Sequence, residues 1–159
     1  MRFLGLAITL LAIGQIVLCV VFYGRVGSET LINLGWLVMW LSAIFGWLPI
    51  FTFRRYGEVG GRGYVHTTRL VDRGVYAIVR HPQYLAGVLL CIALGLITPH
   101  WTVILLGLAS IPFYYVNTFS EERQNIAKFG DAYLDYMQRV PRMNFLLGIV
   151  RLLRHRIAK

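Results

Sequence analysis

The sequence FLGLAITLLAIGQIVLCVVFY, residues 3–23, contains no charged side chain. A helix of this length crosses the roughly 30 Å hydrocarbon core of a bilayer. Residues 31–53 form a second apolar run without a charged side chain, interrupted by glycines, a few neutral polar residues such as Asn33 and Ser42, and Pro49. Because every backbone polar group needs a partner inside lipid, long apolar runs of this kind form helices there. The two runs predict a protein that begins with two membrane-spanning helices.

Two further apolar runs follow, at residues 83–97 and 101–119, joined by the short connection Thr98-Pro99-His100. The first is short for a span, and the connection predicts a helical hairpin. We therefore expect an all-α integral membrane fold with about four transmembrane helices. Residues 3–23 could instead be a signal peptide, since Arg2 precedes them. That run is long and has no small-x-small cleavage site before Arg25, so we expect it to be retained.

The composition agrees with a membrane protein and gives an orientation. Of 159 residues, 57% are hydrophobic and 14% charged, which is too apolar for an ordinary soluble domain. Sixteen Lys and Arg oppose 7 Asp and Glu, and they gather in residues 54–80 and in the tail rather than in the apolar runs. Cytoplasmic loops and anionic lipids explain this pattern better than nucleic acid. We expect a multi-pass protein with both termini and the 54–82 connection in the cytoplasm.

The remaining features suggest one domain: two N-terminal spans (1–53), a connection with a motif (54–82), a helical hairpin (83–119) and a cytoplasmic tail (120–159). Residues 119–139 place apolar side chains at helical spacing, which predicts an amphipathic helix at the cytoplasmic interface, broken at Gly130 and stopped by Pro141. The glycines between residues 57 and 63 follow no strand, so they favour a hinge or lid over a nucleotide loop. Cys19 and Cys91 lie in apolar runs without metal-ligand spacing, and we expect no metal site.

Candidate functional residues lie in Arg80-His81-Pro82-Gln83-Tyr84, directly before the third apolar run. Pro82 suits the first turn of a helix, where free backbone N–H groups favour the anionic parts of a ligand. His81 and Tyr84 can hydrogen-bond a ligand there. Each residue also has a simpler interpretation, because arginine anchors, interfacial histidines and aromatic belts are common at membrane surfaces.

Four other polar residues stand out. Glu121 and Glu122 are adjacent carboxylates that repel one another and contribute little to topology. They are either solvated charges on an interfacial helix or ligands for a cation or for hydroxyl groups. Gln15 is most simply a hydrogen-bond partner between helices, and Asn117 is either that or a pocket residue.

Four ordered blocks of sequence together resemble a known family. They are LVDRGVY (70–76), RHPQY (80–84), Glu121-Glu122 and FGDAYLDYMQRVP (129–141). In this order they resemble the isoprenylcysteine carboxyl methyltransferase family, which is related to the membrane phospholipid methyltransferases. The resemblance covers residues 68–141.

The resemblance implies an integral-membrane enzyme that binds S-adenosylmethionine in a cytosol-facing pocket, with a lateral opening for a lipophilic or prenylated substrate from the bilayer. The positions that it implies for the cofactor pocket are Thr68, Arg69, Leu70, Val71, Tyr76, His81, Pro82, Gln83, Tyr84, Glu121 and Glu122. The prenylcysteine enzymes of the family carry an arginine that meets the substrate carboxylate where this chain has Asn117. An asparagine holds a carboxylate less well. Arg139 or Arg123 could compensate, and a lipid amine or hydroxyl is an equally plausible acceptor.

Two other functions remain open at this point. Membrane sterol and steroid reductases carry a similar Arg-His-Pro-x-Tyr turn, so an NADPH-dependent reductase is one alternative, although such enzymes usually lack the glutamate pair. A non-enzymatic small membrane protein is the other, associating through helix faces that carry Gly87, Gly95 and Gly107. The four ordered blocks favour the methyltransferase.

Overall fold

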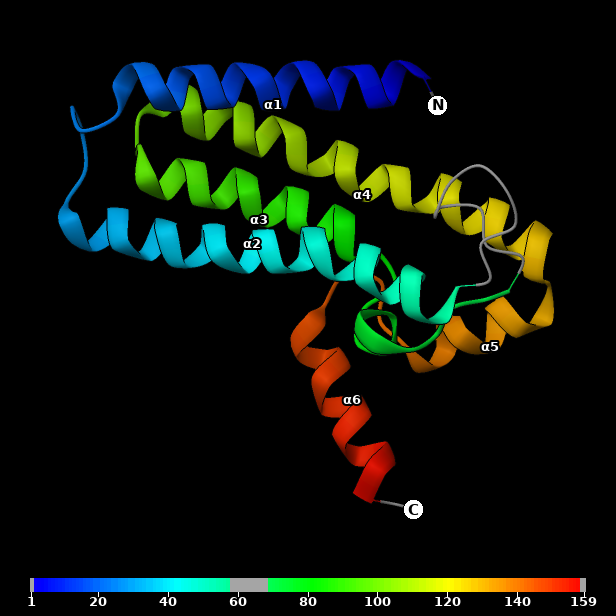
Figure 1. The fold of residues 1–159 in the computed structure, drawn as a ribbon. Helices are drawn as coiled ribbons and strands as arrows, with labels where there is room; N and C mark the ends of the chain where they lie inside the picture. The colour runs from blue at the N-terminus through cyan, green and yellow to red at the C-terminus, as the bar shows by residue number, and fades with distance from the viewer. Residues whose placement is uncertain (1, 58–68, 158–159) are drawn as a thin grey trace. The chain divides into compact units, whose positions relative to one another are not determined.

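The computed structural model describes residues 2–57 and 69–157, and the regular structure in these ranges is helical. The elements are α1 (Arg2–Phe22), α2 (Glu29–Tyr56), the short 3-10 helix η1 (Gly74–Ala77), α3 (Pro82–Ile97), α4 (Trp101–Phe129), α5 (Asp131–Arg139) and α6 (Phe145–Ile157) (Figure 1). The chain forms two compact units, residues 1–44 with 84–120 and residues 45–83 with 121–159. Thr68 and the glycines of residues 60–63, which the sequence analysis singled out, fall outside the described residues.

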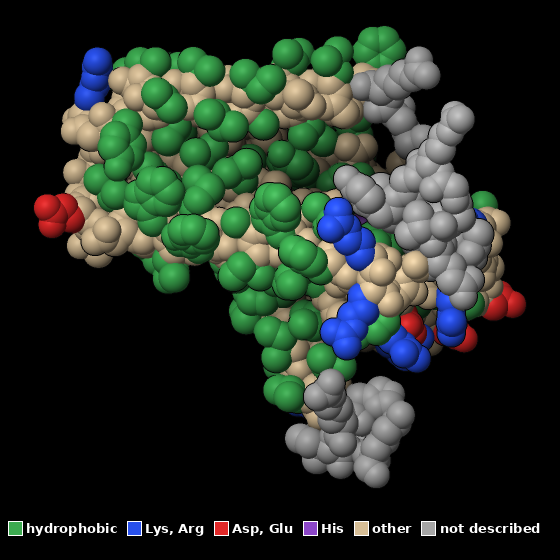
Figure 2. All heavy atoms as spheres, in the orientation of Figure 1, with side chains coloured by type: hydrophobic (Ala, Val, Ile, Leu, Met, Phe, Trp, Pro, Cys, Tyr) green, Lys and Arg blue, Asp and Glu red, His purple; other side chains and the backbone are tan. Residues whose placement is uncertain are grey.

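Three helices, α1, α2 and α4, are long and apolar enough to cross a membrane. Large apolar side chains point outward from them, as the green surface over α1 and α2 shows (Figure 2). Phe3 is 89% exposed and Trp40 is 68% exposed. A surface of that kind suits lipid rather than water, so the chain is a membrane protein of all-α class. Helix α3, with 16 residues, is shorter than a usual span, and the count of about four spans stays a prediction.

Residues 1–44 and 84–120 pack around a small apolar core and one buried amide. The core cluster consists of Cys19, Leu94, Ile97 and Val103. Gln15, 1% exposed, donates hydrogen bonds from Nε2 to the carbonyl oxygens of Cys91, at 3.0 Å, and Val103, at 3.1 Å. These bonds join α1 to α3 and α4, which confirms the role predicted for Gln15.

Close helix packing in this unit depends on glycine. A Cβ built on Gly35 would lie 2.6 Å from Cγ1 of Ile97 and 2.8 Å from its backbone nitrogen. A Cβ on Gly87 would collide with the ring of Tyr114. Gly87 therefore makes room for the side chain of a neighbouring helix.

Helix α4 is longer than its apolar run, because it continues past residue 119 to Phe129. Residues 120–129 contain neither proline nor glycine and include several good helix formers, so nothing stops the helix where the apolar run ends. The predicted break is at Gly130, which has a φ of 57°, and α5 ends at Arg139, just before Pro141. The amphipathic segment is therefore divided between the end of α4 and α5.

Candidate functional site

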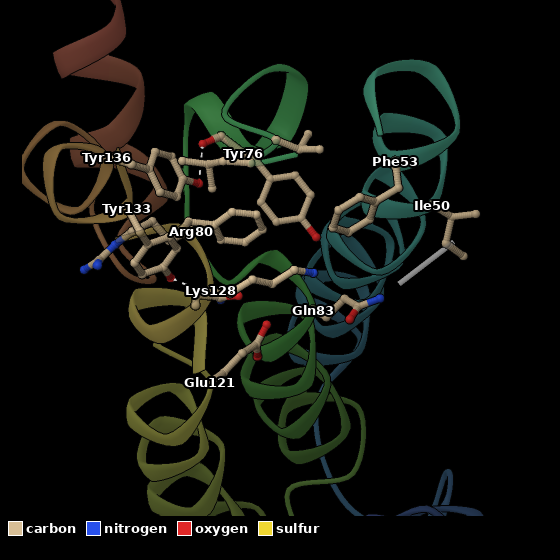
Figure 3. A pocket seen from close by; sticks show the side chains of 13 residues that line it. Ile50, Phe53, Tyr76, Arg80, Gln83, Glu121, Lys128, Tyr133 and Tyr136 are labelled. Carbon is tan, nitrogen blue, oxygen red and sulfur yellow. Dashed lines mark hydrogen bonds between the residues drawn. The ribbon is translucent and has the colours of Figure 1, made fainter. Parts of the chain in front are cut away.

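A cavity lies within the unit formed by residues 45–83 and 121–159 (Figure 3). Its wall comes from the end of α2, from residues 70–83, from the end of α4 and from α5. The lining residues are Ile50, Phe53, Leu70, Val71, Tyr76, Arg80, Gln83, Glu121, Asn125, Lys128, Phe129, Tyr133 and Tyr136.

Aromatic rings form much of the wall and hold one another in place. Phe53 and Tyr76 pack with ring centroids 5.0 Å apart, and Tyr133 and Tyr136 with centroids 5.7 Å apart. The Tyr136 hydroxyl donates to the carbonyl oxygen of Tyr76 at 2.7 Å. Burial, and to a smaller degree the charge of Glu121, raises the pKa of the Tyr76 hydroxyl. The ring contacts and the hydrogen bond fix the aromatic side chains in position, and the raised pKa keeps the Tyr76 hydroxyl uncharged.

Several polar side chains line the cavity. Figure 3 shows the Tyr76 hydroxyl, the Glu121 carboxylate and the Lys128 amine directed towards its middle, with the Gln83 amide beside them. The Glu121 side chain is 47% exposed, so its charge is accessible to a ligand. The cavity thus offers a carboxylate, an amine and neutral hydrogen-bonding groups between aromatic surfaces, and Arg80 also lines it.

Glu122, the neighbour of Glu121, is instead buried behind the wall, with 3% of its surface exposed. Arg142 donates to both of its carboxylate oxygens, from Nη2 at 2.6 Å and from Nε at 3.1 Å. His81 Nε2 lies 3.2 Å from Oε1, and Arg80 Nη1 lies 2.9 Å from the same oxygen. The Arg80 contact is an ion pair rather than a well-directed hydrogen bond, because Nη1 has no hydrogen-bond partner in the described part of the chain.

His81 lies between the two carboxylates. Its Nδ1 is 3.7 Å from Oε2 of Glu121, and its Nε2 faces Glu122. Burial alone would lower the pKa of the imidazole, but the hydrogen bonds and charges of the two glutamates outweigh burial and raise it above 6.5. At 3.7 Å the contact with Glu121 is an ion pair rather than a hydrogen bond, so a charged His81 attracts the Glu121 carboxylate from behind the wall.

Two backbone hydrogen bonds fix the tail against this cluster. The N–H of Arg80 donates to the carbonyl of Pro141 at 3.0 Å, and the N–H of His81 donates to that of Arg142 at 3.1 Å. Further along the tail, the rings of Phe45 and Phe145 pack 5.4 Å apart. The chain beyond α5 therefore helps to build the site.

The structure brings together five of the residues that the resemblance implied for the pocket. The residues that line this same cavity are Leu70, Val71, Tyr76, Gln83 and Glu121. Their role as cofactor contacts stays a prediction.

The other implied residues lie elsewhere. Arg69 lines a second cavity, which shares Leu70, Val71 and Phe129 with the first. Pro82 is fully buried at the start of α3, and Tyr84 belongs to the other unit.

Of the two residues considered for positioning the substrate, Asn117 belongs to the unit of residues 1–44 and 84–120. Arg139 forms an exposed ion pair with Asp72, with Nη2 and Oδ2 3.5 Å apart. Neither residue lines the cavity.

Sequence reasoning missed several lining residues. Asn125 and Lys128 follow Glu121 by four and seven positions on one helix, a spacing that places three side chains on one face. That spacing would have revealed them. Ile50 and Phe53 gave no such signal, because they lie in a run that predicts only a spanning helix.

The raised pKa of His81 predicts a pH dependence of stability. A group that binds its proton more tightly in the folded state stabilises that state fully below its unfolded pKa of 6.5, and the contribution is lost as pH rises through the folded value. We expect the thermal midpoint of the detergent-purified protein to exceed that of His81→Gln most near pH 6, with a difference that shrinks towards pH 9. A difference that is constant or grows with pH would contradict a charged His81.

Comparison with known proteins identifies the family of this chain. The family model for phospholipid methyltransferases matches residues 30–132. Methanethiol S-methyltransferase 2 of Bradyrhizobium diazoefficiens is 36% identical over 117 residues, a match that covers 68% of this chain and 41% of that protein. The chain thus spans about two fifths of the length of that relative, and no solved structure matches it. Because the family model covers more than half of the chain, the protein belongs to the phospholipid methyltransferase family, as its sequence motifs predicted.

Proposed function

We propose that the protein is an S-adenosylmethionine-dependent membrane methyltransferase whose cofactor binds in the cavity beside Glu121. The observation that carries the proposal is an accessible carboxylate on an aromatic-walled cavity, in a chain of the phospholipid methyltransferase family. The name of the similar Bradyrhizobium protein, a methyltransferase, supports the same reaction class.

The residues of the cavity suit the chemical groups of this cofactor. A sulfonium cation and a ribose diol are matched by a carboxylate, and Glu121 supplies one. Cations also bind over aromatic faces, and flat bases stack on them, which the rings of Phe53, Tyr76 and Tyr133 allow. The Gln83 amide adds a donor and an acceptor.

The cofactor supplies an activated methyl group when it is bound. The chain itself has to orient its ligands and exclude water. Glu122 holds His81, whose Nδ1 lies 3.7 Å from the Glu121 carboxylate, and the protonated hydroxyls of Tyr76 and Tyr136 give the wall neutral polar groups. In this account no side chain of the chain is required as a nucleophile.

The ligand-binding experiment is a calorimetric titration of the detergent-purified protein with S-adenosylhomocysteine. We expect the wild type to bind, and Glu121→Gln to bind roughly tenfold to a hundredfold more weakly, because it loses charge-assisted hydrogen bonds. Glu29→Gln is the matched control, since that exposed carboxylate lies at the start of α2 and does not line the cavity. A separate titration with NADPH tests the reductase alternative.

Each result of this titration has a clear meaning. Binding of S-adenosylhomocysteine that is weakened in Glu121→Gln and unchanged in Glu29→Gln would support the proposal. Equal binding by wild type and Glu121→Gln would contradict the site, and binding of NADPH alone would favour the reductase. Absence of binding to both ligands would favour a non-enzymatic membrane protein.

We further propose that the acceptor is a lipophilic nucleophile without a carboxylate, that it enters from the bilayer, and that the site faces the cytoplasm. Asn117 offers no charge to a substrate carboxylate, and the acceptor in the relative's name, methanethiol, is a small apolar thiol. The basic residues of the tail support the cytoplasmic orientation.

Transfer of labelled methyl groups from S-adenosylmethionine tests the acceptor. With the protein in phosphatidylcholine vesicles, we expect label on a medium-chain alkyl thiol and little on a farnesylcysteine carboxylate. Both acceptors are lipophilic, so the comparison isolates the carboxylate. Preferential labelling of the farnesylcysteine would show that another residue replaces the family arginine and would refute this acceptor class.

A further inference from the structure

One side of helix α6 is fixed to the unit that contains the cavity. The ring of Phe145 packs on a ring of α2, and a Cβ built on Gly148 would collide with the carbonyl oxygen of Ile78. Arg151 adds a hydrogen bond from Nη1 to the carbonyl oxygen of Gln138 in α5, at 3.2 Å. These contacts determine which side of α6 faces the protein and which side is left outward.

A second side of α6 is apolar and exposed. Four large aliphatic side chains follow the spacing i, i+3, i+4 and i+7, which places them in one line along a helix. This apolar stripe consists of Leu146, Ile149, Val150 and Leu153, each between 39% and 63% exposed. Figure 2 shows hydrophobic side chains at the surface over the first turns of α6. Single exposed leucines are common on proteins, but a continuous stripe marks a contact surface.

The place where α6 begins indicates what the stripe contacts. Phe145 packs on Phe45, with ring centroids 5.4 Å apart. Phe45 lies inside the apolar run of α2, about 12 Å along the helix axis before that run ends at Phe53. Helix α2 is long and apolar enough to cross a membrane, and the same part of it exposes Trp47 and Phe51. The first turn of α6 is therefore level with a part of α2 that suits lipid.

The length and charge of α6 favour the membrane surface over a further span. Its 13 residues measure about 20 Å along the axis, less than the roughly 30 Å of hydrocarbon. Residues 151–159 contain no acidic side chain, and their basic residues are Arg151, Arg154, Arg156 and Lys159. A helix with an apolar stripe and basic side chains lies in the plane of the interface. Arginines near the surface of a bilayer favour anionic lipids.

We propose that α6 is an interfacial anchor that binds an anionic lipid leaflet, with the apolar stripe among the upper acyl carbons and Arg154 at the lipid phosphates. The inference is independent of the proposed function. It gives the tail a second fixed point. Arg142, between α5 and α6, holds Glu122 on one side of this connection, and the bilayer holds α6 on the other.

The test measures where two positions of α6 lie in the full chain, in phosphatidylcholine vesicles with and without phosphatidylglycerol. Cys19 and Cys91, which are buried, are replaced by alanine. A single cysteine, Leu153→Cys or Arg151→Cys, then carries an environment-sensitive fluorophore. Arg151→Cys is the matched control, because position 151 lies about 160° around the helix from position 153. The quenchers are a phospholipid with a nitroxide high on its acyl chain and aqueous iodide.

The two positions should respond in opposite ways. In vesicles with phosphatidylglycerol, we expect the nitroxide to quench the label at position 153 at least roughly twofold more than the label at position 151, and iodide to prefer position 151. Omission of phosphatidylglycerol should reduce nitroxide quenching at position 153. Arg154→Gln should reduce it in the anionic vesicles, because one cation is lost at the lipid phosphates. Thermal midpoints confirm that each variant is folded.

Three results would overturn the proposal. A label at position 153 that iodide quenches and the nitroxide does not would show that the stripe faces water. A label shielded from both quenchers would show that protein covers the stripe, such as a second copy of the chain. Equal nitroxide quenching in the two kinds of vesicle would refute binding to anionic lipid. The titration with S-adenosylhomocysteine is a separate measurement, so failure of the anchor leaves the proposed function standing.

Discussion

The buried carboxylate of Glu122 is the constraint on which the site depends. A charge with 3% exposure is tolerated only when partners replace the water that it has lost. Within the described residues Glu122 has three such partners, and they come from two distant stretches of sequence: Arg80 and His81 precede α3, and Arg142 follows α5. One side chain of α4 thus fixes the entrance to α3 and the tail in a single arrangement.

That arrangement gives two adjacent glutamates different environments. Consecutive residues on a helix project about 100° apart, so Glu122 faces the arginines while Glu121 faces the cavity. His81 contacts both carboxylates and couples them. The site therefore presents one accessible negative charge whose position is set by a second, inaccessible one, and the aromatic wall surrounds it. A ligand with a cationic group would meet a carboxylate that needs little reorganisation, which is how a preformed site reduces the cost of binding.

Much of the fold could be predicted from the sequence, because the strongest signals were local. Apolar run length located α1 and α2 to within a few residues, Pro82 marked the start of α3, and Gly130 and Pro141 marked the ends of α4 and α5. The boundary of α4 was less clear, since the apolar run ends near residue 119 but the helix does not. Hydropathy detects where lipid contact ends, whereas helix formation continues until a residue that breaks it.

The site was only partly predictable. Resemblance identified Tyr76, Gln83 and Glu121, which do line one cavity, but it gave no means of separating them from His81, which lies behind the wall. The pairing of Arg142 with Glu122 joins residues 20 positions apart through the path of the tail. No spacing rule predicts such a contact, because it depends on the tertiary course of the chain.

The most direct test of this account is the thermal unfolding of Glu122→Gln beside Glu121→Gln, in the same detergent and without ligand. Removing the buried charge leaves Arg80, Arg142 and His81 without their anion. We expect Glu122→Gln to lose about 3–5 kcal/mol of stability, a fall in midpoint of roughly 10 °C for a chain of this size. Glu121→Gln, with its exposed side chain, should unfold within a few degrees of the wild type. If Glu122→Gln unfolded at the wild-type temperature, or both variants were equally destabilised, Glu122 would not be the residue that holds the site together.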